Sequence, residues 1–180
     1  VPVDIGDERD GMTALHLTAL ADARDDNTRC QTAKILLGKG ARIDCEGTQG
    51  FTTLSLAAGA NGMEPLVSFL VKEGADINHQ DQEGNPPLYH AIFADAWTPE
   101  AVADVLCEGA PEFEETVRPV PSRETVAFLV SHPKFNWASL KDVQEPITIL
   151  KERIKDTKED EKRQELEAVL SLVQDSLYAY

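Results

Sequence analysis

Two short motifs recur in the same order along this chain, and their recurrence constrains the fold more than any other feature. The first motif contains a glycine and occurs as "GKGARID" (38–44), "KEGADIN" (72–78) and "CEGAPEF" (107–113). The second motif occurs as "DGMTALHLTA" (10–19), "QGFTTLSLAA" (49–58) and "EGNPPLYHAI" (83–92). Gly40 and Gly74 are 34 residues apart. A period of this length indicates stacked helix-turn-helix units, each of which supplies part of its neighbour's interior.

The recurring spacing places particular residue types where a helix pair needs them. The helix openings carry an N-cap or first-turn residue at Thr13, Thr52 and Pro86. Leucines two positions later are expected to face the neighbouring unit: Leu15, Leu54 and Leu88. Each second helix is expected to end at a glycine in the left-handed conformation: Gly40, Gly74 and Gly109.

The motifs "TALHLTA" and "EPLVSFLVKEGADIN" resemble the helix opening and the second helix of the ankyrin-repeat family. The resemblance implies an all-α solenoid of helix-turn-helix units joined by short β-hairpin-like loops. It also implies a protein-interaction module that binds through the hairpin tips and the concave face of the inner helices.

We expect one domain over residues 1–180, with degenerate repeats. The expected units are 10–44 (repeat 1, with an acidic insert), 45–78 (repeat 2), 79–137 (repeat 3, with a proline-rich insertion and an extra outer helix) and 138–180 (a C-terminal cap repeat). The acidic insert, "ADARDDNTRC" (21–30), is interpreted as a longer turn between helices rather than a contact loop.

The third repeat allows two registrations. In one, "PEAVADVLCEGA" closes the repeat and "ETVAFLVSH" belongs to a half-repeat. In the other, "TPEAVADVLCEGAPEFEETVRPVPS" is a long insertion and "ETVAFLVSH" is the true outer helix. Ser122 followed by an acidic residue indicates where this helix begins.

The C-terminal segment predicts a helix pair that caps the solenoid. Pro146 starts its first helix, and the apolar face of that helix carries Ile147, Ile149, Leu150 and Ile154. The second helix carries an apolar face of Leu166, Val169, Leu170 and Val173 opposite a polar face. A repeat array needs such a polar-faced end because an uncovered apolar face would contact water.

The sequence contains no glycine-rich phosphate-binding loop and no nucleophile motif. The four histidines do not stand at metal-ligand spacing with another histidine or cysteine, so we expect no catalytic residue, no metal site and no cofactor. His16 stands at the histidine of "TALH", which the resemblance assigns to a structural hydrogen-bonding role. Cys45 is expected in an exposed hairpin.

Charge and cysteine usage restrict the partner and the compartment. The chain has 17 basic and 32 acidic residues and a net charge of -15, which disfavours nucleic acid and anionic membrane surfaces. We therefore expect a protein or peptide partner of basic or amphipathic character and a monomeric domain. Three cysteines at wide spacings favour a reducing compartment, so the expected location is intracellular, cytoplasmic or nuclear. The first residues, Val-Pro, suggest a fragment, so the alternative function is the recognition arm of a larger enzyme or effector.

The candidate partner-binding residues are those that the resemblance places at hairpin tips and on the concave face. They are Asp10, Met12, Leu20, Gln49, Phe51, Gln82, Glu83, Asn85, Phe93 and Trp97, with Ala21, Gly59, Ala60 and Ala94 beside them. For Phe93 and Trp97, packing under the loop at 111–122 is the alternative interpretation. Asn78 resembles the hairpin asparagine that asparaginyl hydroxylases modify in this family.

Overall fold

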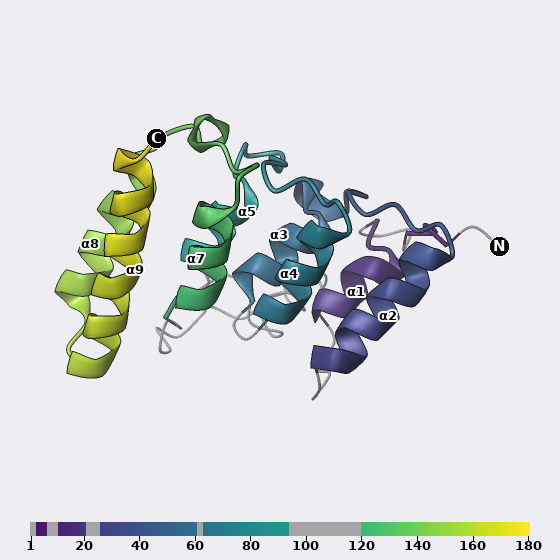
Figure 1. The fold of residues 1–180 in the computed structure, drawn as a ribbon, viewed down its shortest axis with the longest axis horizontal. Coiled ribbons are helices and arrows are strands. Elements are labelled where there is room, and N and C mark those ends of the chain that lie inside the picture. Colours follow the sequence, from purple (N-terminus) through teal and green to yellow (C-terminus); the bar gives the residue numbers. More distant parts are fainter. Residues whose placement is uncertain (1–2, 7–10, 21–25, 61–62, 94–119) are drawn as a thin grey trace, which may run out of the picture.

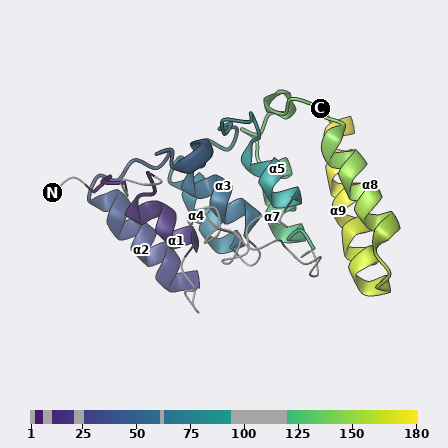
Figure 2. The same ribbon diagram turned by 180° about the vertical axis from the view of Figure 1, so that it is seen from behind.

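The computed structural model describes residues 3–6, 11–20, 26–60, 63–93 and 120–180, which form helices and loops. Four helix pairs stand side by side along the long axis of the molecule, from the N-terminal pair to the C-terminal pair (Figures 1 and 2). The pairs are α1 (Ala14–Leu20) with α2 (Asp26–Gly38), α3 (Thr53–Gly59) with α4 (Glu64–Lys72), α5 (Pro87–Ile92) with α7 (Arg123–Ser131), and α8 (Glu145–Asp156) with α9 (Asp160–Tyr178). In the described part of the chain, two 3₁₀ turns lie in the loops: η1 (Thr48–Gly50) and η3 (Trp137–Ser139). The all-α solenoid predicted from the repeat is confirmed.

Each inner helix contacts the next inner helix, and each outer helix contacts the next outer helix. The inner row is α1, α3, α5 and α8, and the outer row is α2, α4, α7 and α9. The predicted interior leucines Leu15, Leu54 and Leu88 are buried, as expected for side chains between neighbouring pairs. One continuous apolar core therefore runs through all four pairs.

Local sequence explains where the helices begin. The Thr52 hydroxyl accepts a hydrogen bond from the Ser55 backbone N–H at 3.2 Å and caps α3. Ser122 caps α7 in the same way by accepting from the Thr125 N–H at 3.2 Å. Helix α5 begins at Pro87, whose missing N–H costs nothing in a first turn.

Glycine ends two outer helices in the predicted conformation. Gly40 follows α2 with φ 94° and Gly74 follows α4 with φ 105°. The Ala75 N–H returns to the Leu70 carbonyl at 3.0 Å, and the Gly74 N–H to the Val71 carbonyl at 3.1 Å. These two bonds close the Schellman motif that a left-handed residue permits. Gly109 lies outside the described residues.

The structure favours the second registration of the third repeat. Helix α7 contacts both α5 and α4, which is the place that α4 occupies against α3 and α2. The segment "ETVAFLVSH" is therefore the outer helix of the third pair. The residues between α5 and Val120 belong largely to 94–119, which lies outside the described part of the chain.

The first pair differs from the sequence expectation. Helix α2 has 13 residues, whereas α4 has 9. Asp26–Cys30 belong to α2, so the C-terminal part of the acidic insert lengthens the outer helix instead of forming a turn. The rest of the insert, 21–25, lies outside the described residues.

The C-terminal pair packs on the third pair through both apolar and polar contacts. Ile147 and Leu150 of α8 and Leu166 of α9 are buried. The Arg153 guanidinium of α8 donates to the Ile92 carbonyl at 2.9 Å, where α5 ends. The Trp137 indole N–H reaches Ser176 Oγ in α9 at 3.3 Å. Within the described residues, none of the helices has the length and apolar character needed to cross a membrane.

Candidate partner-binding surface

Two hairpin tips form a continuous edge of the solenoid, which we call the tip edge. The first tip is residues 47–51 and the second tip is residues 81–85. Within each tip a backbone hydrogen bond closes the turn. The Gly47 N–H donates to the Phe51 carbonyl at 2.9 Å, and the Asp81 N–H donates to the Asn85 carbonyl at 3.1 Å. A hydrogen bond from the Gln82 N–H to the Gln49 carbonyl at 2.9 Å joins the two tips. A Cβ at Gly50 would lie 3.0 Å from the Gln82 nitrogen, so this close approach requires glycine.

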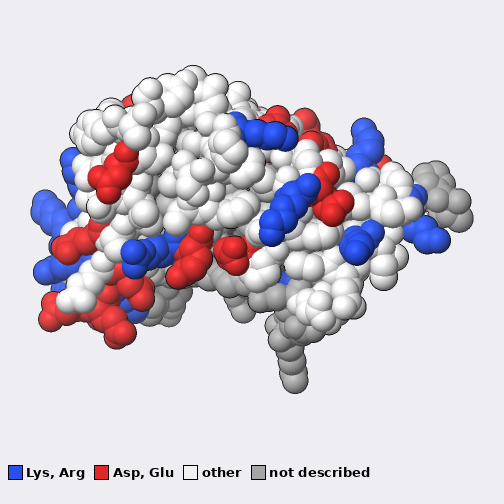
Figure 3. Space-filling model, viewed as in Figure 1, with Lys and Arg blue, Asp and Glu red and all other residues white. Residues whose placement is uncertain are grey.

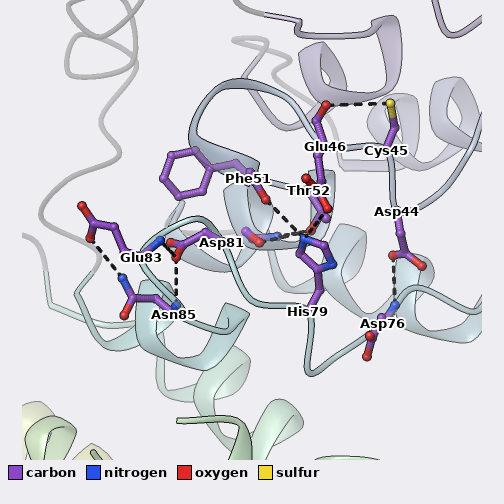
Figure 4. Close-up of polar contacts among 12 residues, drawn as sticks. Asp44, Cys45, Glu46, Phe51, Thr52, Asp76, His79, Asp81, Glu83 and Asn85 are labelled. Atoms are coloured by element: carbon purple, nitrogen blue, oxygen red, sulfur yellow. Dashed lines mark hydrogen bonds and ion pairs between the residues drawn. The ribbon is translucent and has the colours of Figure 1, made fainter. Parts of the chain in front are cut away.

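Asp81 holds the second tip from the inside. Its Oδ1 accepts from the N–H groups of Glu83 at 2.9 Å and Asn85 at 2.8 Å (Figure 4). Its Oδ2 lies 3.0 Å from Nε2 of His90 on α5, and the two side chains are only 2% and 6% exposed. The tip is therefore anchored to the inner helix by a buried carboxylate.

Two pKa shifts describe the electrostatics of this tip. Burial acts to raise the pKa of Asp81, but the hydrogen bonds from His90 and from the Asn85 and Glu83 N–H groups outweigh it. The pKa of Asp81 is thus below its ordinary value of 3.8, and the carboxylate is ionised at neutral pH. The pKa of Tyr89 is raised, first by burial and then by the negative charges of Glu145, Glu83 and Asp81.

An Asp or Asn side chain joins each loop to the next one. Asp4 accepts from the Arg42 N–H at 3.0 Å, and Asp44 accepts from the Asp76 N–H at 3.0 Å. Asn78 continues the series, because its side-chain oxygen accepts from the Asn136 N–H at 2.8 Å. The Asn78 amide also donates to the Lys134 carbonyl at 2.8 Å. These bonds fix the spacing of the tips.

Several predicted site residues lie on the surface of this edge. Gln49, Gln82 and Glu83 are exposed, and Asn85 is half-buried with its amide donating to Glu83 Oε2 at 3.2 Å. Away from this edge, at the C-terminal ends of the inner helices, Leu20 in α1 and Ala60 after α3 are half-buried. Asp10, Ala21, Ala94 and Trp97 lie outside the described residues.

Met12 and Phe51 are core residues, which contradicts their expected role as exposed anchors. Each is 5% exposed. Met12 packs beneath the first tip, where a Cβ at Gly47 would lie 2.7 Å from the Met12 sulfur. The Phe51 ring meets the His90 ring edge-on, with centroids 5.2 Å apart. Both side chains support the tips from within and offer no area to a partner.

The concave face is also less open than expected at its centre. Every residue of α3, from Thr53 to Gly59, is buried. Gly59 is therefore not available as a contact residue. The tip edge is left as the principal candidate surface among the described residues.

The histidine and cysteine predictions have different outcomes. The Thr13 N–H donates to His16 Nδ1 at 3.0 Å, and His16 Nε2 lies 3.1 Å from the Phe51 carbonyl. The structural role of His16 is confirmed, because both ring nitrogens bond the backbone. The expected exposure of Cys45 is wrong: its side chain is buried and its sulfur accepts from the Arg42 guanidinium at 3.4 Å.

Tyr89 and His90 were not predicted as site residues, whereas Phe93 was. The ring of Tyr89 on α5 stacks on that of Phe93, the residue that follows this helix, with centroids 4.0 Å apart and an angle of 24° between the planes. His90 stands where the other two helix openings carry Leu17 and Leu56. A titratable side chain at an apolar position of the repeat was the signal that could have revealed its partner Asp81.

The described residues contain no group of three or more histidine, cysteine, aspartate or glutamate side chains placed to hold a metal ion. The features that the tip edge does offer are exposed amides and carboxylates on a rigid backbone beside a half-exposed aromatic pair.

Comparison with known proteins agrees with this geometry. The family model described as "Ankyrin repeats (3 copies)" matches residues 1–81 and again residues 22–115. A curated relative, the inactive serine/threonine-protein kinase TEX14 of Mus musculus, is 38% identical over 65 residues. That match covers 36% of this chain and 4% of TEX14.

Proposed function

The chain belongs to the ankyrin-repeat family, whose members are in general non-catalytic protein-interaction modules, and from this premise we propose that it binds a protein or peptide partner through its tip edge. The observation that carries the proposal is the contrast between buried side chains, which hold the tips in place, and exposed side chains on the tips. Asp81, Phe51 and His16 fix the tips from within, whereas Gln49, Gln82 and Glu83 are exposed. A rigid edge with exposed side chains loses little conformational entropy on binding.

The partner is proposed to be basic or amphipathic. The net charge of -15 favours the approach of a cationic segment and opposes nucleic acid and anionic membranes. On the face drawn in Figure 3, acidic and basic side chains are interspersed around a broad uncharged area. The attraction is therefore proposed to come from the overall charge, with contact specificity from the tips. We further propose that the isolated domain is monomeric and acts inside the cell.

A matched pair of variants tests the tip edge. Gln82→Lys with Glu83→Lys reverses charge at the second tip, and Gln164→Lys with Glu165→Lys makes the same chemical change on exposed residues of α9. Peptides selected from a random displayed library against the native chain are expected to be rich in basic residues. They should bind the α9 variant like the native chain and lose affinity for the tip variant. Equal loss for both variants would leave only a general charge effect and contradict the tip assignment.

Ionic strength tests the electrostatic part separately. The association rate of a selected peptide is expected to fall as salt rises, because screening shortens the range of attraction to about 8 Å at physiological ionic strength. A rate that does not change with salt would remove the steering proposal and leave the tip edge untouched.

A second candidate function is the recognition arm of a larger enzyme or effector. Its support is TEX14, a much longer relative named as an inactive kinase, which this chain matches over a short stretch. The parent gene's flanking sequence tests it, since a flanking catalytic or effector domain is the expected result.

Hydroxylation of Asn78 stays a prediction. Its side chain is half-buried and engaged with Lys134 and Asn136, so these bonds must break before an enzyme can hold it. A gain of one oxygen in intact mass after exposure to an asparaginyl hydroxylase would establish the modification.

A further inference from the structure

Tyr89 and Phe93 form an aromatic pair at the inner side of the second tip. They are four positions apart, Tyr89 in α5 and Phe93 directly after it, and they stack at a centroid distance of 4.0 Å. Both side chains are half-buried, so part of the stacked pair stays accessible. Tyr89 also contacts the buried His90 edge-on, at 5.9 Å, which fixes one side of its ring.

Two carboxylates belong to elements that pack against α5. Glu83 comes from the second tip, and Glu145 from the first turn of α8, which contacts α5. The pKa of Tyr89 is raised first by burial and then by the negative charges of Glu145, Glu83 and Asp81, in agreement with this placement.

Only two of these carboxylates are available to a partner. Asp81 is buried and bonded to His90 and to the tip backbone. Glu83 is exposed and is oriented by the Asn85 amide, and Glu145 is half-buried at the start of its helix. A partner that reaches the aromatic pair therefore meets one acid from the tip and one from α8.

We propose that Tyr89, Phe93, Glu83 and Glu145 form an arginine site that receives an arginine side chain of a peptide partner. A guanidinium is planar and cationic, so it stacks on an aromatic face and pairs with carboxylates at its edge. A lysine ammonium lacks the planar surface and gains less from the stacked rings. This inference rests on the proposed function and names the chemistry that one part of the tip edge recognises.

A cationic side chain lies beside the second tip. The Lys141 side chain lies across Gly84, where an added Cβ would collide with it. Its ammonium therefore lies near the second tip and offsets part of the local negative charge. Removal of this charge by Lys141→Gln is expected to tighten arginine binding by about twofold.

The test uses the ¹⁵N-labelled full chain and the probe acetyl-Gly-Arg-Gly-amide, with the citrulline peptide as the uncharged isostere. Amide signals from residues 82–93 and 145–148 are expected to shift with the arginine peptide, and the citrulline peptide to cause no comparable shift. Equal shifts with both peptides, or arginine-induced shifts spread over all acidic surfaces, would overturn the proposal.

Variants identify the groups that bind. Tyr89→Leu and Glu145→Gln are each expected to weaken the arginine peptide by about threefold. Glu152→Gln, at an exposed position of the same helix α8, is the matched control and should leave affinity unchanged. Tyr89→Phe keeps the ring and should bind like the native chain, which keeps the test valid if Tyr89→Leu unfolds. Equal effects of Glu145→Gln and Glu152→Gln would reject the site.

The outcomes separate this site from the general function. One outcome is a library-selected peptide that loses affinity for the tip variant and yet binds Tyr89→Phe, Tyr89→Leu and Glu145→Gln as tightly as the native chain. That result would support the proposed function and reject the arginine site. Specific arginine-peptide shifts in a chain for which no tip-dependent peptide can be selected would retain the site and reject the wider function.

Discussion

The Asp81 carboxylate lies 3.0 Å from the His90 imidazole in the interior, with both side chains almost fully buried. This contact joins a hairpin tip to the inner helix of the same repeat. The other oxygen of Asp81 accepts two backbone N–H groups of the tip. One side chain therefore determines both the shape of the tip and its attachment to the core.

Asp81→Asn should lower the free energy of unfolding by roughly 1–3 kcal/mol at pH 7, because a buried hydrogen-bonded charge is lost. The folded-state pKa of Asp81 is below 3.8, so its stabilisation is complete above that pH and is lost as the pH falls through the folded value. Urea unfolding from pH 7 to pH 2.5 should show the two proteins converging in acid. A stability gap that is constant over this range would contradict the ionised state of Asp81.

Gly74→Ala should destabilise the chain by about 1 kcal/mol, because alanine is strained at φ 105°. No atom lies within 4 Å of the Cβ position, so the cost is conformational and not steric. Gly38→Ala is the matched control, since it also has open space but lacks a positive φ. That control should be neutral or slightly stabilising in the same thermal unfolding measurement.

Asn78→Ala should lower stability by about 1–2 kcal/mol, because two bonds to the loop at 134–136 are removed together. Asn78→Asp keeps the acceptor for the Asn136 N–H and loses the donor to the Lys134 carbonyl. Its effect should therefore be intermediate. Hydrogen exchange of the Asn136 backbone N–H should become faster in the alanine variant alone. If this N–H stays protected in both variants, its hydrogen bond to Asn78 contributes little to stability.

Arg153→Met should loosen the C-terminal pair, since the end of α5 loses a charged donor at 2.9 Å. We expect a loss of roughly 1–3 kcal/mol in the free energy of unfolding. Lys151→Met changes an exposed cation on the same helix and serves as the control. Similar unfolding midpoints for the two variants would show that the Arg153 bond does not hold α8 against α5.

Much of the fold followed from local chemistry that is visible in the sequence. Thr52 and Ser122 cap helices because their hydroxyls reach the N–H three residues on, and Gly40 and Gly74 have the positive φ that their positions require. The pairing of α8 with α9 followed from apolar residues at helical spacing. These features depend on neighbours in the chain, so a periodic pattern is enough to predict them.

The site was less predictable, because burial at a tip depends on what packs beneath it. Met12 and Phe51 occupy tip positions in the sequence, and the structure turns both into the core. Asp26–Cys30 appeared to be a loop because most of them are polar, yet they form the start of α2, where Asn27 and Thr28 are exposed and Arg29 and Cys30 are half-buried.

The sequence by itself determined the repeating unit, its capping residues, its glycine stops and the order of helices, because each follows from local conformation and periodicity. Only the tertiary structure decided that Asp81 meets His90, that Arg153 reaches Ile92 and that α7 is the third outer helix. Those pairings join residues that are 9, 61 and about 35 positions apart in the chain. The Asp81–His90 contact depends on how the tip folds back onto α5 within one repeat. The Arg153–Ile92 contact and the position of α7 depend on the angle and spacing at which the helices stack, and this geometry results from side-chain packing across the whole core.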